Sequence, residues 1–472
     1  MPNPGEEIIK ERLRQIPSVE KILESPELQS DIAEFSHPLV AAAVKRAVEV
    51  IRGEVKEGKE PISGGEIVRM VKNIIAEQTS AALKPVINAA GVILHTNLGR
   101  APMDGETLSF IQNVSVTYSN LEFDLKEGKR SKRGIFVEKL LCLLTSAEAA
   151  MAVNNNAGAV LLILSALASG KEVIVSRGEL VQIGGGFRIP EILALSGAKL
   201  KEVGTTNQTA IADYENAITS ETAILLKVHQ SNFKMIGFVK RPLINELVAL
   251  GKRHKLCVVE DLGSGVLLRT EDFKLAHEPT AFEALSSGAD LVCFSGDKLL
   301  GAPQAGIILG KKKYIDILKK HPLHRALRLD KMFLAGLEKV LLYYLKGQAT
   351  EKIPVWRMIS TPLKNLQVRA EKIKAELEES GIAVAIQESE STVGGGSLPG
   401  ETLPTITISV ESARTGARLG APSVDQQAKL FREQSPPIIG RIENDRFVLD
   451  LRTVFPHQDE VVISAVRNIF SK

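Results

Sequence analysis

Cysteine is scarce in this chain, and its placement excludes two common classes of protein. The three cysteines, Cys142, Cys257 and Cys293, are far apart and form no C-x-x-C pair, so we expect neither a disulfide framework nor a zinc site. Cys257 and Cys293 lie in apolar, strand-like stretches, which predicts buried free thiols. This use of cysteine is typical of a reducing compartment.

Long apolar runs and a strong charge imbalance are also absent. No stretch approaches the ~18 apolar residues of a membrane-spanning helix, and the N-terminal residues lack the basic and apolar regions of a signal peptide. The 59 Lys/Arg against 56 Asp/Glu leave a net charge of only +3, so overall charge gives no argument for a nucleic-acid partner. We expect no membrane association, no metal site and a cytoplasmic location.

The 472 residues are too many for one hydrophobic core, and the patterning changes twice along the chain. We expect an N-terminal helical domain over residues 1–80, a large α/β domain over 81–354 and a small α+β domain over 355–472. The first of these carries 11 Lys/Arg against 14 Asp/Glu. Its composition therefore favours a structural or oligomerisation role at least as much as RNA binding.

Between residues 151 and 310, short apolar blocks alternate with helical blocks. This alternation predicts a mostly parallel sheet with helices on both faces. Polar clusters follow most of the apolar blocks. Because ligands of such sheets bind beyond the carboxyl ends of the strands, these clusters predict a binding site there.

The most informative cluster is Ser295-Gly-Asp-Lys298, which follows four apolar residues. A lysine at a strand end among apolar neighbours is partly desolvated, which lowers its pKa and frees the amine as a nucleophile. Alone, the pattern is more typical of a surface lysine. However, another apolar run ends in Asp261, about 37 residues upstream. A Schiff-base lysine and an acid for the pyridine nitrogen are the two groups that pyridoxal 5'-phosphate (PLP) requires.

The stretch Asn154-Asn-Asn-Ala-Gly158 opens an apolar helical block. Its small residues allow close approach of the backbone, which suits a phosphate group at the helix N-terminus. An ordinary asparagine N-cap is the alternative. The hydroxyl of Ser295 and the glycines after Lys298 would suit the same phosphate.

Three further stretches could face anions. Residues 85–102 open from an apolar run into a loop with His95 and Arg100, although a strand and turn with one solvated arginine would look the same. Arg325 and Arg328 lie about one helical turn apart, so both side chains could face one anion. The basic residues of 118–134 indicate either a solvated loop or contact with a polyanion such as a phosphate backbone. These basic residues are Lys126, Lys129, Arg130, Lys132 and Arg133.

Over nearly its whole length, the chain resembles the bacterial selenocysteine synthases, the L-seryl-tRNA(Sec) selenium transferase family. The resemblance is carried by INAAGVILHTNLGR (87–100), SRGELVQIGG (176–185), FSGDKLLG (294–301), VGGGSLPGETLP (393–404) and PIIGRIE (437–443). Ala302 is a small departure, because the family more often has a second glycine there.

The resemblance implies a fold-type-I PLP-dependent transferase of α/β class, with a mostly parallel sheet in the large domain. It makes Lys298 the Schiff-base lysine and places Asp261 on the pyridine nitrogen. The residues implied to hold the rest of the cofactor are Asn155, Asn156, Ala157 and Ser295 at the phosphate and Asn232 at the ring hydroxyl. The residues implied to act on the anionic selenium donor or in catalysis are Arg100, Arg325, Arg328 and Asp297.

The implied reaction converts seryl-tRNA(Sec) into selenocysteinyl-tRNA(Sec) with selenophosphate. The seryl amine displaces Lys298 from the cofactor as an aldimine, water leaves to give an aminoacrylyl-tRNA, and selenium adds at the β-carbon. The resemblance also implies tRNA recognition by residues 1–80 and a homo-oligomer, a decamer of five dimers.

Two alternatives remain. A related PLP-dependent lyase or ammonia-lyase acting on a small amino acid or sugar acid would share the large-domain motifs, and Arg452 stands where such enzymes often bind a free carboxylate. The N-terminal helices and the basic run 126–133 favour tRNA, because a small substrate needs neither. The other alternative is a non-catalytic tRNA-binding scaffold, against which the presence of both Asp261 and Lys298 argues.

Overall fold

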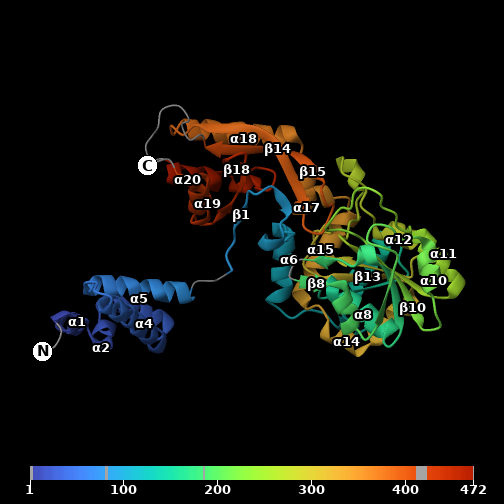
Figure 1. Ribbon diagram of the computed structural model, residues 1–472, viewed down its shortest axis with the longest axis horizontal. Helices are drawn as coiled ribbons and strands as arrows, with labels where there is room; N and C mark the ends of the chain where they lie inside the picture. Colours follow the sequence, from blue (N-terminus) through green and yellow to red (C-terminus); the bar gives the residue numbers. More distant parts are fainter. Residues whose placement is uncertain (1–3, 80–82, 184–185, 411–421, 471–472) are drawn as a thin grey trace. The chain divides into compact units, whose positions relative to one another are not determined.

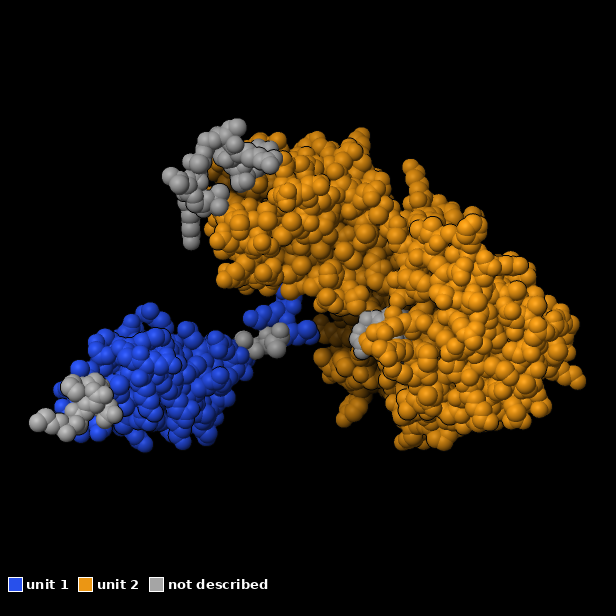
Figure 2. Space-filling view, in the orientation of Figure 1, with its two compact units in different colours: residues 1–85 blue, residues 86–472 orange. Residues whose placement is uncertain are grey.

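The computed structural model describes residues 4–79, 83–183, 186–410 and 422–470 of the chain (Figure 1). The chain divides into two compact units, residues 1–85 and residues 86–472 (Figure 2). In the described ranges, no helix is both long and apolar enough to cross a membrane. Gly184 and Gly185, which end the 176–185 motif, lie outside the described residues.

The N-terminal unit is a set of helices around one apolar core. The helices are α1 (Pro4–Gln15), α2 (Val19–Leu23), α3 (Gln29–Phe35), α4 (His37–Lys56) and α5 (Gly64–Thr79), with the 3-10 turn η1 (Pro26–Leu28). On α4 the buried positions recur every three or four residues, as at Val40, Val44, Val48 and Ile51. One face of α4 therefore packs inward while the other carries its charges. This agrees with the helical spacing of apolar residues in 1–80.

The second unit is built on a seven-stranded sheet. Its strands, in their order across the sheet, are β5 (Ala149–Val153), β13 (Gly306–Gly310), β12 (Leu291–Ser295), β11 (Cys257–Gly263), β10 (Thr222–Val228), β6 (Glu172–Ser176) and β9 (Lys199–Val203). Only β13 pairs antiparallel, with β12 on one side and β5 on the other. The expectation of a mostly parallel sheet is confirmed.

Both faces of this sheet are covered, as the alternation of side chains on β12 shows. Val292 and Phe294 point into one hydrophobic cluster, and Leu291 and Cys293 point into another. Helices on the first face include α7 (Ile135–Thr145), α12 (Ala281–Ser286), α15 (Lys331–Leu345) and α17 (Pro354–Ser360). Those on the second include α8 (Asn156–Ala168), α9 (Ile189–Leu195) and α13 (Lys312–Lys320). Cys257 and Cys293 are buried free thiols, as predicted.

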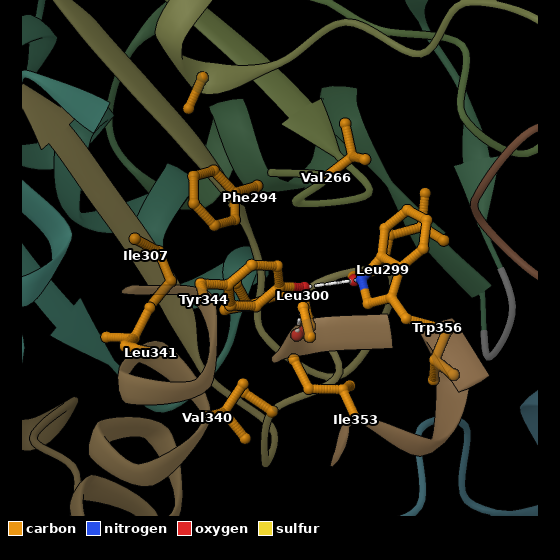
Figure 3. Close-up of a cluster of buried hydrophobic side chains, with 14 of the residues drawn as sticks. Val266, Phe294, Leu299, Leu300, Ile307, Val340, Leu341, Tyr344, Ile353 and Trp356 are labelled. Atoms are coloured by element: carbon orange, nitrogen blue, oxygen red, sulfur yellow. Dashed lines mark hydrogen bonds between the residues drawn. The ribbon is translucent and has the colours of Figure 1, made fainter. Parts of the chain in front are cut away.

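A polar contact inside the first cluster fixes the turn that follows β12. The Trp356 indole Nε1 donates to the Tyr344 hydroxyl at 2.7 Å (Figure 3). The Tyr344 hydroxyl lies 3.0 Å from the carbonyl oxygen of Leu300, to which it can donate in turn. All three residues are buried. The backbone two residues after Lys298 is therefore held by a satisfied polar chain within an apolar core.

Four strands from the last third of the chain and one from residues 92–94 form a second sheet. Its strands, in order, are β17 (Arg441–Glu443), β18 (Arg446–Asp450), β15 (Thr402–Val410), β14 (Val384–Gly394) and β2 (Val92–Leu94). A separate parallel pair joins β1 (Ile87–Asn88) to β16 (Ile438–Ile439). The helices packed on this part are α18 (Leu363–Glu378), α19 (Val424–Arg432) and α20 (Asp459–Phe470).

The pairing of β2 with β14 departs from the expected domain boundaries. We expected residues 86–94 in the large domain, but they lie in the C-terminal sheet, and residues 86–472 form one unit. Arg441 is one reason, since its Nη1 donates to the buried Asp450 at 2.7 Å and to the carbonyl oxygen of Ala90 at 2.9 Å. Gly91 is another: a Cβ there would lie 2.1 Å from Asp450 Oδ2.

The remaining elements connect these layers, except for two helices, residues 211–217 and 244–254, that also pack on the seven-stranded sheet. They are the hairpin β3 (Phe123–Asp124) with β4 (Lys129–Arg130), the hairpin β7 (Gln182–Ile183) with β8 (Phe187–Arg188), and the helices α6 (Gly105–Ser115), α10 (Ile211–Ala217), α11 (Ile244–His254), α14 (Pro322–Ala326) and α16 (Ala349–Lys352).

Candidate active site

Two hollows meet at Lys298, beyond the carboxyl ends of β10, β11 and β12. The larger, of about 320 Å³, is lined by residues of the C-terminal sheet and its loops together with Arg100 and Asn232. The smaller, of about 180 Å³, is lined by Asp261, Ser295 and the start of α8. Both therefore lie where a doubly covered parallel sheet binds its ligands.

Lys298 is the centre of this site and is only 4% exposed. Burial lowers the pKa of its amine, and the positive charge of Arg100 lowers it further, while Asp261 and Asp297 act in the opposite direction. A lysine with a lowered pKa has a larger neutral fraction at a given pH. It is accordingly a better nucleophile and base than a surface lysine.

Asp261 is buried at the end of the neighbouring strand. Its Oδ1 accepts from Asn156 Nδ2 at 2.8 Å and from the backbone N–H of Gly263 at 3.1 Å. Burial raises the pKa of this carboxyl, and the Asn156 hydrogen bond and the charge of Lys298 oppose the rise. A buried carboxylate requires a cationic partner, and a protonated pyridine nitrogen is such a partner.

Arg100 and Asp297 form an ion pair at the wall shared by the two hollows. The distance from Arg100 Nη1 to Asp297 Oδ2 is 3.0 Å. Arg100 also has a left-handed backbone, with φ +60°, and its N–H donates to the carbonyl oxygen of His95. The structure thus brings two expected site residues, 197 positions apart, to Lys298.

The start of α8 offers a place for an anion, although not through the side chain of Asn155. Asn155 Oδ1 accepts from the Gly158 N–H at 2.8 Å, so this residue is the N-cap that we had left as an alternative. Asn156 is bonded to Asp261. What remains for a phosphate are the backbone N–H groups of the first turn, at Asn156 and Ala157, and the hydroxyl of Ser295 in the same hollow.

Asn232 lies in the larger hollow with Lys298, and its Nδ2 donates to the carbonyl oxygen of Gln182 at 3.3 Å. On the smaller hollow, His229 Nε2 lies 3.3 Å from the carboxylate of the buried Glu278. His229 directly follows the apolar run 223–228 and so belongs to one of the polar clusters at the strand ends, but no pattern indicated Glu278. The negative charge of Glu278 raises the pKa of Lys298.

The glycine run 394–396 is a part of the site that the sequence did not reveal. The run has no pattern of a phosphate-binding loop, but a Cβ at Gly396 would lie 2.5 Å from Lys298 Nζ. Gly394 and Gly396 both have positive φ, +104° and +79°. Only glycine combines this backbone with such a close approach to the lysine. The glycine run itself was the available signal.

Arg325 and Arg328 do not join Arg100 within one chain. Helix α14 ends at Ala326, so the two arginines do not share a helix, contrary to expectation. Arg328 lines a third hollow, where its Nη1 lies 3.6 Å from Glu122 Oε1. Arg325 is exposed, and neither residue lines the hollows at Lys298.

Arg452 is occupied by the protein itself. Its guanidinium donates to the backbone carbonyl oxygens of Met358 at 2.7 Å, Thr361 at 3.0 Å and Pro404, and the residue is 4% exposed. It therefore clamps the C-terminal sheet to α17 and its following loop, and two of its guanidinium nitrogens already have backbone acceptors.

A desolvated lysine just after one parallel strand and a buried acid on the adjacent one, with a helix N-terminus in the same hollow, define a PLP-dependent enzyme of fold type I. The donor set fits the cofactor, because the buried acid has room for a cationic partner and the glycine run makes space at the lysine. A family model described as L-seryl-tRNA selenium transferase matches residues 86–455, and one described as selenocysteine synthase N terminal matches residues 13–52. The chain belongs to the L-seryl-tRNA selenium transferase family.

Individual relatives agree with this assignment. An L-seryl-tRNA(Sec) selenium transferase of Geobacter sulfurreducens is 46% identical over 97% of this chain and 99% of that protein. One of Carboxydothermus hydrogenoformans is 45% identical over 95% and 96%. Among solved structures, a D-glucosaminate-6-phosphate ammonia-lyase matches with a TM-score of 0.58 and 22% identity over 84% of this chain and 97% of that one. This last likeness shows the fold alone.

Proposed function

We propose that the chain converts seryl-tRNA(Sec) into selenocysteinyl-tRNA(Sec), with selenophosphate as the selenium donor. The observation that carries the proposal is the buried Lys298 beside the Arg100–Asp297 pair, in a chain similar over nearly its full length to enzymes of that name. This site combines a base of lowered pKa with a positioned cation.

Bound PLP supplies an electron sink for negative charge that develops at the α-carbon of the seryl group. In this site, Lys298 would hold the cofactor covalently, Asp261 would hold its ring nitrogen, and the first turn of α8 with Ser295 would hold its phosphate. Once released, the Lys298 amine is the group placed to take the α-proton, because its lowered pKa favours the neutral form. Any side chain at position 396 would collide with this amine, and glycine leaves the amine free.

The contacts of Arg452 favour an aminoacyl ester over a free acid as the substrate. A free amino acid has a carboxylate that needs a cation, whereas the ester of a charged tRNA has none. The Arg452 guanidinium is bonded to the carbonyl oxygens of Met358, Thr361 and Pro404. This favours the transferase over the lyase alternative, although the ammonia-lyase shares its fold.

For the donor, we propose that Arg100 acts with Arg325 and Arg328 of a second copy of the chain. Arg100 faces Lys298, and the other two arginines lie elsewhere on their own chain. A homodecamer, a cytoplasmic location and tRNA recognition by residues 1–80 are parts of the same proposal. Exposed apolar side chains on the second unit, such as Val116 and Leu143, support self-association.

The test is to incubate the PLP-loaded chain with seryl-tRNA(Sec) and selenophosphate and to identify the amino acid esterified to the tRNA. Selenocysteine is expected with the unaltered chain, and serine alone with Lys298→Ala. Recovery of serine alone from both proteins, in the presence of a bound cofactor, would contradict the proposal. Release of ammonia from a small amino acid or sugar acid would instead support the lyase alternative.

A further inference from the structure

The third hollow, of about 430 Å³, is separate from the site at Lys298, and the two share no lining residue. Its walls carry a marked excess of positive charge. The cationic side chains are Arg130, Lys132, Arg133, Lys319, Lys320 and Arg328, and the acidic ones are Glu122, Glu138 and Asp316. The hollow therefore carries an excess of three positive charges, which equals the net charge of the entire chain. The rest of the chain is neutral on balance, so the excess positive charge is concentrated at this hollow.

The three acids of the hollow do not form a separate ion pair with each of these cations. Glu122 alone faces three arginines: Arg133 at 3.0 Å, Arg130 at 3.2 Å and Arg328 at 3.6 Å. Lys132 and Lys320 are exposed, and neither has an ion pair within 4.0 Å among the described residues. Two lysine charges and a shared set of arginines are therefore available to an anion from outside.

The hairpin β3–β4 borders this hollow and adds aromatic surface to it. Phe123 of β3 stands directly opposite Arg130 of β4, and Arg130 lines the hollow. Phe123 is 47% exposed, and Leu125 in the turn is 74% exposed. Exposed aromatic rings beside a cationic groove are the combination that binds unpaired nucleotides, because bases stack on the rings while phosphates contact the cations.

We propose that the hollow and the β3–β4 hairpin bind the phosphodiester backbone of the RNA substrate, at a part of it that is not base-paired. The proposal deepens the proposed function and rests on it. It depends on Lys132, Lys320, Arg130 and Phe123, and not on Arg328, which the proposed donor site uses. Without Arg328, five cations remain, spread over the segment 130–133 and helix α13. They exceed what one small anion contacts, whereas a polynucleotide presents several phosphates in series.

The test is the equilibrium affinity of the full-length, PLP-loaded chain for seryl-tRNA, measured over a range of salt concentrations. The variant is K132E/K320E, and the matched control is K199E/K252E. Lys199 and Lys252 are also exposed lysines of the second unit, and no ion pair within 4.0 Å is found for them among the described residues. Both double variants change the net charge by the same amount, so a general charge effect would appear in both.

K132E/K320E is expected to bind at least about tenfold more weakly than the control and to lower the slope of log K against log salt by about 2. The visible absorbance of bound PLP is expected to be unchanged in all proteins. Equal affinity and slope for the two double variants would overturn the proposal. So would displacement of the tRNA from the unaltered chain by millimolar inorganic phosphate. A lower oligomeric state of K132E/K320E in sedimentation would also overturn it, because Lys132 and Lys320 would then hold copies of the chain together and not the RNA.

The experiment also separates this inference from the proposed function. If the unaltered chain binds seryl-tRNA but the variant binds equally well, only the role of the hollow is wrong. If the unaltered chain binds no seryl-tRNA at all, both proposals fall.

Discussion

Arg100 Nη1 lies 3.0 Å from Asp297 Oδ2, and both residues line a hollow with Lys298. The two charges act on the lysine with opposite signs: Arg100 lowers the pKa of Lys298, and Asp297 raises it. Asp297 therefore positions the Arg100 guanidinium and at the same time limits how far Arg100 lowers the pKa of Lys298.

Changing either member of this pair should move the pKa of Lys298 in a predictable direction. Asp297→Asn removes a negative charge, so the pKa of Lys298 should fall. Arg100→Gln removes a positive charge and leaves Asp297 unpaired, so the pKa should rise. The measurement is the rate at which PLP added to the cofactor-free protein forms its visible band near ~420 nm, as a function of pH.

Only the neutral amine reacts, so the rate declines as the pH falls through the pKa of Lys298. The acidic limb of the profile should shift to lower pH in Asp297→Asn and to higher pH in Arg100→Gln. If the acidic limb shifted in the same direction in both variants, the pair would act on Lys298 by another route, such as a change in the conformation of the site.

Gly396→Ala should impair cofactor binding. A Cβ there would lie 2.5 Å from Lys298 Nζ, on a backbone with φ +79°. The matched control is Gly400→Ala, which has nearly the same φ, +78°, but whose Cβ would meet only Lys234 Cδ at 3.8 Å. Each substitution costs roughly 1 kcal/mol in backbone strain.

Loss of PLP affinity, measured by titration of the visible band, is therefore expected for Gly396→Ala and not for Gly400→Ala. Equal behaviour of the two variants would mean that backbone strain, and not the contact with Lys298, determines the requirement for glycine.

Asn156→Ala should weaken PLP binding without loss of the fold. The 2.8 Å hydrogen bond from Asn156 to Asp261 Oδ1 lowers the pKa of that carboxyl, so its removal raises the pKa. A smaller fraction of Asp261 would then be ionised at a given pH, so its attraction to a protonated pyridine nitrogen would decrease. A several-fold higher dissociation constant for PLP, with the deficit reduced as pH rises, is the expected result; a deficit independent of pH would contradict this explanation.

Tyr344→Phe should lower stability by about 1–3 kcal/mol, because it leaves the buried Trp356 N–H without its acceptor. Tyr118→Phe is the control, since Tyr118 is fully exposed. Denaturant unfolding of the second unit, followed by the fluorescence of the single tryptophan, measures both. A Tyr344→Phe protein as stable as the control would show that the chain to Leu300 contributes little.

The central pair of the site could be predicted because its information is local. Lys298 and Asp261 each end an apolar run, and adjacent parallel strands place such ends together. The residues that surround this pair could not be predicted, because their positions depend on contacts between segments that are distant in the sequence. Gly396, which lies against Lys298, follows β14, and β14 pairs with the distant strand β2. Glu278 reaches His229 from a loop without a pattern. The spacing of Arg325 and Arg328 indicated one helical face, but α14 ends at Ala326, so the two residues do not share a helix.

The partnership of β2 with β14 has a mechanical consequence. Leu94 stands opposite Gly394, so the segment that leads to Arg100 and the loop that carries Gly396 emerge side by side from one sheet, while Lys298 belongs to the other. A rotation of the C-terminal sheet would withdraw the cation and the glycine cover from the lysine together. Opening the site and dismantling its charge arrangement would then be a single motion.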